Sequence, residues 1–145
     1  YYRNHPCAPI YKVYYALRTA AREMDDAAKL TLAVSMDARA WQTDADGRLT
    51  APRSTHPLQT TVYQRLCQSD TVMGWSDAYR SPWCTYTTES GQHIFLWYED
   101  ARSTAEKLSC AKLLGAGSVS VWRLGLIPNY PDEGLHYDVM SVLMK

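Results

Sequence analysis

The stretch from Trp97 to Tyr130, WYEDARSTAEKLSCAKLLGAGSVSVWRLGLIPNY, constrains the fold most, because it places a helix directly before a strand. Asp100 is a good N-cap residue. Lys112 and Gly115 supply a favourable charge and a stop at the other end of the helix. Between them, apolar residues recur at spacings of three and four, the period of an amphipathic helix: Ala101, Ala105, Leu108, Ala111 and Leu114.

A strand over residues 118–124 is predicted next, because side chains of two kinds alternate there. Val119 and Val121 lie on one face, and two serines and Trp122 lie on the other. If helices cover the valine face, Trp122 points into the interior of the sheet at the carboxyl end of the strand. In a (β/α)8 barrel, ligand sites are built at that end. Trp122 is therefore the first candidate binding residue.

The runs WYEDARS and GAGSVSVWRLG resemble the last helix and strand of glycoside hydrolase family 18, the chitinase-like barrels. Within that family, the pattern is most similar to the bacterial spore-cortex and cell-wall glucosaminidases. The tryptophan on the eighth strand of these enzymes forms the floor under the sugar at the cleavage point. The resemblance implies this role for Trp122.

The length of the chain limits how much of such a barrel it can form. At 145 residues and 16.5 kDa it is one ordinary domain, whereas a (β/α)8 barrel typically needs about 200 to 250 residues. The expected fold class is therefore α/β: a partial (β/α)8 TIM barrel, the last two strands and their helices, with a small α+β insertion. The resemblance implies the C-terminal part of a longer catalytic domain.

The first third of the chain predicts one helix and one strand. Apolar spacing indicates a helix from Tyr11 to about Met24, and alternation indicates a strand from Lys29 to Arg39. The seventh strand of the resembled family reads along the lines of G-x-P-x-Y-G-R-x-W, and the aligned stretch here is AVSMDARAW. Arg39 matches this pattern and Asp37 replaces the tyrosine. We expect both side chains to contact substrate. The replacement at Asp37 indicates either that the chemistry of the subsite has changed or that the site has decayed.

Residues 42–96 are expected to form the insertion, and residues 1–41 and 97–145 the barrel elements. The insertion contains a predicted turn at Asp46-Gly47 and a helix over residues 57–68. Three short strands are predicted over residues 73–75, 83–87 and 93–98. An S-P-aromatic run matches the insertion of many family members, which forms one wall of the sugar cleft. The resemblance therefore places Trp83 and Tyr86 on that wall. A last helix from about Glu133 to Met144 closes the chain.

The proton donor of the family is missing from this chain. Family 18 enzymes use substrate assistance, in which the substrate's acetamido group attacks while a glutamic acid protonates the leaving oxygen. That glutamate ends a D-x-x-D-x-D-x-E motif, which the sequence does not contain. Glu99 and Asp100 precede a helix and are expected to cap it and interact with its dipole. We therefore expect no catalytic residue here, and little activity from this chain by itself.

Composition excludes several other functions. Fifteen basic and fifteen acidic residues cancel, so nothing favours nucleic acid or an anionic membrane. No apolar run could span a bilayer, and no signal peptide is visible. The histidines and cysteines lack metal-ligand spacing, so neither a metal nor a cofactor is expected. Cys67 and Cys84 could pair if the protein is exported. The resemblance implies an extracellular, cell-wall or spore-associated bacterial protein.

The expected function is cleavage of β-1,4 links in N-acetylglucosamine-containing glycans by the intact protein, with peptidoglycan or chitin as substrate. One alternative is a chitinase-like protein that binds such a glycan without cutting it, for which Asp37 is mild evidence. Another is a stand-alone α+β domain that mediates protein contacts. A barrel fragment would expose strand edges, so it would need the upstream barrel half or self-association to cover them.

Overall fold

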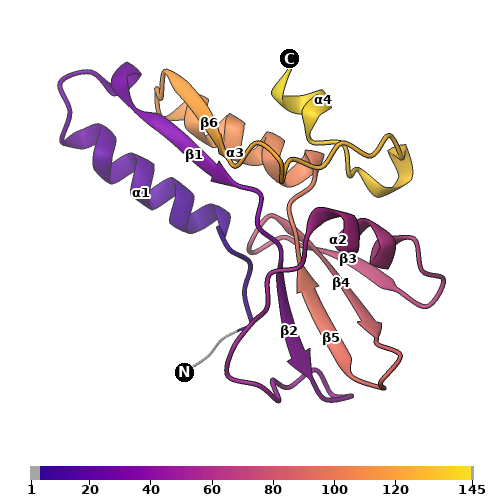
Figure 1. Cartoon of the computed structure of the whole chain (residues 1–145). Coiled ribbons are helices and arrows are strands. Elements are labelled where there is room, and N and C mark those ends of the chain that lie inside the picture. Colours follow the sequence, from indigo (N-terminus) through magenta and orange to yellow (C-terminus); the bar gives the residue numbers. More distant parts are fainter. Residues whose placement is uncertain (1–3, 145) are drawn as a thin grey trace.

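The computed structural model describes residues 4–144 and shows a mixed α/β fold in two parts (Figure 1). In one part, the parallel strands β1 (Thr31–Ser35) and β6 (Ser118–Trp122) lie with helices α1 (Ile10–Arg22) and α3 (Ala101–Leu113). The other part is a four-stranded antiparallel sheet of order β2-β5-β4-β3. Its elements are β2 (Arg39–Thr43), α2 (Gln59–Leu66), β3 (Val72–Ser76), β4 (Ser81–Thr87) and β5 (His93–Trp97).

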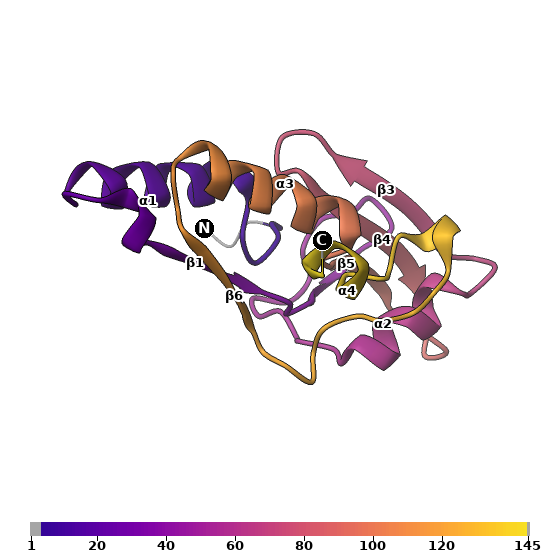
Figure 2. The ribbon, with the colours of Figure 1, turned by 90° about the horizontal axis from the view of Figure 1, so that it is seen from above.

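The two strands of the parallel pair are covered on one face only. Figure 2 shows α1 and α3 together on the same side of β1 and β6. On the covered face, Val34 is 2% exposed and packs in a cluster with Val121 and Val139. On the other face, Ala33 and Ser120 are exposed, as is Trp122. The predicted alternation is confirmed in β1, whereas in β6 Val121 is half-buried and Val119 is 38% exposed. Within residues 4–144 no closed barrel forms.

The predicted strand over residues 29–39 is in fact two strands in two sheets. β1 ends at Ser35, and β2 begins at Arg39 and pairs antiparallel with β5. Met36 and Ala38, in the connection, are 0% and 1% exposed. The chain therefore buries every second residue through the bend, so alternation alone could not show where one strand ends. Consequently, Arg39 belongs to the antiparallel sheet, not to the parallel pair.

The antiparallel sheet buries one face under α2. The helix contributes Val62 and Leu66 to a core that also contains residues of β2, β4 and β5 and the segment near the C-terminus. The three short strands predicted from the sequence are confirmed as β3, β4 and β5, with bounds shifted by one or two residues. Cys84 is fully buried in this core, whereas Cys67 is exposed at the end of α2. Both thiols are free, so the suggested disulfide is not formed.

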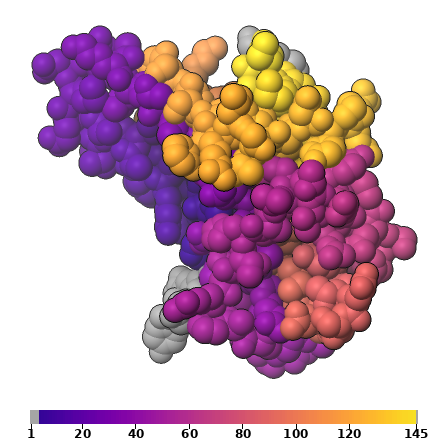
Figure 3. Space-filling view, in the orientation of Figure 1, coloured from indigo at the N-terminus to yellow at the C-terminus, as the bar shows by residue number. Residues whose placement is uncertain are grey.

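The predicted C-terminal helix over residues 133–144 is wrong for most of its length. A single 3-10 turn spans Glu133–Leu135, an extended segment follows, and α4 spans only Met140–Leu143. Tyr137 and Val139 are both 0% exposed, and the Tyr137 hydroxyl donates to Gln59 in α2. Between them, Asp138 forms an antiparallel bridge with Asn129. Figure 3 shows this segment packed over the antiparallel part.

The start of α3 is built around charged and polar groups. The Asp100 carboxylate accepts a hydrogen bond of 2.7 Å from Ser103 N, which confirms the predicted N-cap. Lys107 donates to Glu99, and both side chains are at most 2% exposed. The buried residues of the helix are Ser103, Thr104, Lys107 and Ala111, so of the predicted alanine and leucine face only Ala111 is fully buried. The buried face instead includes Lys107, which pairs with Glu99.

Candidate functional site

The carboxyl ends of β1 and β6 lie side by side at one end of the parallel pair. Ser35, the last residue of β1, lies opposite Trp122, the last residue of β6. Beyond them, Met36 N donates a hydrogen bond of 2.9 Å to Trp122 O. Asp37 N donates to Ser35 Oγ at 3.2 Å, which holds Asp37 just beyond the strand end. The structure therefore brings Asp37 and Trp122 to the same end of the parallel pair.

Trp122 offers an exposed aromatic surface at this end of the parallel pair. Its side chain is 64% exposed, and the residues that precede it on the same face are exposed serines. The peptide bond between Trp122 and Arg123 is cis. An indole combines a large apolar face with one polar N–H, and this combination suits a ligand that has both apolar and polar surfaces. Trp122 can thus serve as a platform for a flat, amphipathic ring.

Arg39 follows Asp37 by two residues, but its side chain points toward the N-terminal segment. Its Nη1 lies 3.5 Å from His5 Nδ1, and its guanidinium carbon lies 6.0 Å from the ring centre of Trp41. Cys7 lies beside it, and burial raises the pKa of the Cys7 thiol, while the Arg39 charge opposes that rise and Asp37 adds to it. Arg39 is therefore half-buried between β2 and residues 5–7. The position of His5 and Cys7 beside Arg39 could not be predicted from the sequence, because this loop has no periodicity.

Trp83 and Tyr86 do not lie on one common wall. They are three residues apart on β4, so their side chains point to opposite faces of the sheet. Trp83 lies against Phe95, with ring centres 5.2 Å apart. Tyr86 packs against the core on the α2 side, where Arg65 lies 5.0 Å from its ring centre. At most one of the two can face a given ligand, and the odd spacing could have shown this.

The acidic residues beside α3, Glu99 and Asp100, are buried and hydrogen-bonded at the start of the helix. Burial raises the pKa of Glu99, although the Lys107 charge opposes the shift, and burial likewise raises the pKa of Asp100 against the Ser103 hydrogen bonds. Both carboxyls are 2% exposed. Within residues 4–144, no group of three or more histidine, cysteine or acidic side chains could hold a metal ion. In the same range, no helix is long and apolar enough to span a membrane.

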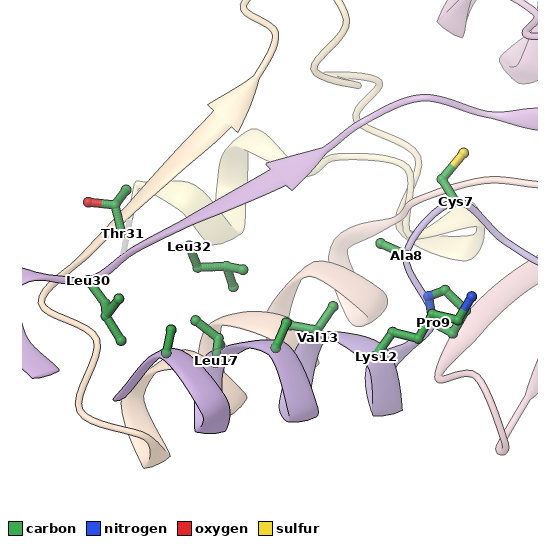
Figure 4. Close-up of a pocket in the computed structure, with 11 residues that line it drawn as sticks. Cys7, Ala8, Pro9, Lys12, Val13, Leu17, Leu30, Thr31 and Leu32 are labelled. Carbon is green, nitrogen blue, oxygen red and sulfur yellow. The ribbon is translucent and has the colours of Figure 1, made fainter. Parts of the chain in front are cut away.

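An apolar cavity lies away from Trp122. It measures about 420 Å³ and lies between α1 and β1 (Figure 4). Side chains from both elements line it, among them Val13 and Leu17 from the helix and Leu32 from the strand. The cavity offers few polar groups, so it is a gap in packing beside the free edge of β1. It is not a site for polar chemistry.

Comparison with known proteins identifies the family. The sequence pattern described as glycosyl hydrolases family 18 matches residues 2–126. The chain belongs to this family. It is 27% identical over 128 residues to a cortical fragment-lytic enzyme of Bacillus subtilis strain 168, covering 88% of this chain and 28% of that protein.

Solved structures share the fold. A spore cortex-lytic enzyme of Bacillus megaterium superimposes with a TM-score of 0.71 at 21% identity, covering 85% of this chain and 28% of the other. A chitinase from Chromobacterium violaceum gives a TM-score of 0.72 at 19% identity, covering 97% and 41%. The chain thus spans less than half the length of these relatives.

Proposed function

We propose that this chain forms the C-terminal part of a family 18 catalytic domain and supplies one side of its glycan cleft. The observation that carries the proposal is the exposed indole of Trp122 at the carboxyl end of β6, beside Asp37. Ligand sites of barrel enzymes lie at that end of the strands. β1 and β6 would be the last two strands of the barrel, and residues 39–97 the inserted wall.

The intact protein would hydrolyse β-1,4 links of glycans that contain N-acetylglucosamine. The names of the relatives, which include cortex-lytic enzymes and a chitinase, support peptidoglycan or chitin as the substrate and the spore or cell wall as the location. Trp122 would stack under the sugar, and Asp37 and Arg39 would bind its polar edges. On the inserted wall, Trp83 is the better candidate contact, since Tyr86 faces the core.

The general acid would come from outside this chain. Glu99 is bound to Lys107 and Asp100 caps α3, and both are buried. Asp37 is the remaining carboxylate beside Trp122, at the carboxyl ends of β1 and β6. General acid catalysis contributes about 10²- to 10⁴-fold, so this chain alone should bind glycan with little hydrolysis. The replacement of the family's tyrosine by Asp37 supports a second candidate function, that of a family member that binds glycan without hydrolysing it.

The test compares the chain with Trp122→Ala and with Leu124→Ala, which removes another exposed apolar side chain from the same end of β6. Calorimetry with N-acetylglucosamine oligomers should show binding by the parent and by Leu124→Ala, with a marked loss in Trp122→Ala. Reducing-end release from the oligomers and from peptidoglycan should be negligible for all three. Hydrolysis that depends on Trp122 would show that the chain carries its own acid, and equal binding by all three would remove Trp122 from the site.

A further inference from the structure

A second pocket, of about 280 Å³, lies between the antiparallel sheet and the start of α3. Its walls come from three parts of the chain: Trp75 of β3, Tyr98 with the first turn of α3, and the 3-10 turn over residues 133–135. Neither Trp122 nor Asp37 lines it. It is therefore separate from the proposed glycan surface.

Two buried polar side chains line this pocket with hydrogen-bonding capacity to spare. Tyr98 is 5% exposed and Asp100 is 2% exposed. Within residues 4–144, the Asp100 carboxylate receives hydrogen bonds from Ser103 only, and the Tyr98 hydroxyl takes part in none. Neither side chain is among those of residues 4–144 that hold a buried atom without a hydrogen-bond partner, so the free oxygens remain accessible from the pocket. They can accept from a donor, preferably a cationic one, because Asp100 is an acid.

An arginine without an acidic partner stands at the mouth of the same pocket. The Arg102 guanidinium carbon lies 4.0 Å from the ring centre of Trp75, and the side chain is exposed. Among the residues that the structure describes, Arg102 forms no salt bridge, whereas the neighbouring Arg80 is bound by Asp77 and Glu106. A stacked guanidinium held in one orientation presents its remaining N–H groups to a carboxylate.

The remaining wall is fixed in place. Ala101 N, in the first turn of α3, donates a hydrogen bond of 2.8 Å to His136 O, which ties the C-terminal segment to the helix. The His136 side chain also lines the pocket and can donate to an anion. The backbone that carries Asp100 and Arg102 is therefore tied to the backbone that carries His136.

We infer that this pocket binds a small zwitterion, a free α-amino acid or the same group at the end of a peptide. Its ammonium would donate to the Asp100 carboxylate and to Tyr98 Oη, and its carboxylate would accept from Arg102 and His136. The apolar lining residues Pro82 and Leu135 would pack against the carbon atoms. The inference does not depend on the proposed glycan function, because the two sites share no residue.

The experiment uses alanine as the probe, with propionate and ethylamine as matched compounds that each lack one charge. Binding is followed on the 145-residue chain by NMR, at the indole N–H of Trp75, which is assigned with Trp75→Phe. Alanine should shift this signal in a saturable way. Propionate and ethylamine should each bind about tenfold more weakly or worse, which is the scale of one lost charge-assisted hydrogen bond.

Two variants test the two charges. Asp100→Asn keeps a good N-cap residue and removes the carboxylate, and Arg102→Gln removes the guanidinium from an exposed position. Each should weaken alanine binding by about tenfold or more. Arg22→Gln, on the exposed side of α1, is the control and should bind as the parent does. Absence of an alanine shift, equal shifts with propionate, or parent-like affinity in a folded Arg102→Gln would each overturn the inference.

Discussion

The ion pair of Glu99 and Lys107 is a residue-scale weak point of the molecule, because both groups are at most 2% exposed. Lys107→Met would leave the Glu99 carboxylate buried without its cation. Breaking a buried pair in this way typically costs about 3–5 kcal/mol. Urea unfolding should show a loss of that size in the free energy of unfolding. Lys112→Met, at an exposed position of the same helix, should change it by at most about 0.5 kcal/mol. A loss in Lys107→Met no larger than that of the control would contradict a structural role for the pair.

Asp100 should make stability depend on pH. Burial raises the pKa of this carboxyl in the folded protein, so the folded state binds the proton more tightly than the unfolded chain, whose Asp pKa is about 3.9. The free energy of unfolding therefore falls as pH rises from the unfolded pKa to the folded one, and this contribution is constant above it. Asp100→Asn lacks this contribution and keeps the cap. Its stability relative to the parent should rise across that interval when both are unfolded in urea between pH 4 and pH 7. A difference that does not change with pH would refute the assignment.

At the scale of elements, the approach of β6 to the turn over residues 27–29 depends on one glycine. A Cβ built at Gly117 would lie 2.0 Å from the backbone oxygen of Ala28, and backbone cannot move aside as a flexible side chain can. Gly117→Ala should therefore destabilise the protein by about 1–3 kcal/mol, the usual cost of overpacking. Gly125→Ala is the matched control, since nothing lies within 4 Å of its Cβ position. Thermal unfolding followed by circular dichroism distinguishes them, and equal midpoints would disprove the close approach.

Elements that are set by local chemistry could be predicted from the sequence. The Asp100 cap, the stop at Gly115 with its φ of 80° and the alternation of β6 all act within a few residues. The break between β1 and β2 could not be predicted, because Met36 and Ala38 continue the alternation while the chain changes sheets. The prediction of a helix in the C-terminal segment was wrong for a related reason. Its apolar residues fit a helical period, but Tyr137 contacts Gln59 of α2, 78 residues away in sequence, and Asp138 forms a bridge with Asn129.

The candidate site was predictable in part for the same reason. The carboxyl ends of neighbouring parallel strands lie together, so the two strand assignments were enough to place Trp122 and Asp37 near each other. The position of Arg39 required knowing that β2 pairs with β5, which is a contact between distant segments. The pocket around Asp100 was also hidden, because its groups come from β3, α3 and the C-terminal turn. Only the assembled structure shows that they meet.

At the scale of the whole molecule, the parallel pair is the least complete part. Among residues 4–144, β1 and β6 pair only with each other, so each strand has one free edge. Parallel sheets are normally covered on both faces, yet Ala33, Ser120 and Trp122 are exposed here. The apolar cavity of about 420 Å³ beside β1 adds uncovered surface. Unpaired strand edges attract other chains. The rest of the family domain, or another copy of the chain, would cover these surfaces.

The chain by itself should therefore self-associate. Sedimentation velocity should show an average mass that rises with protein concentration above that of the 16.5 kDa monomer. Ala33→Lys places a charge in the middle of β1 on its open face, and lysine on an exposed edge strand opposes pairing. This variant should shift the distribution toward monomer. Thr19→Lys adds the same charge at an exposed position of α1 and should leave association unchanged. If the parent is monomeric at every concentration, β1 and β6 form a complete unit as they stand, and a chain that needs no further barrel strands fits the stand-alone domain better than the partial barrel.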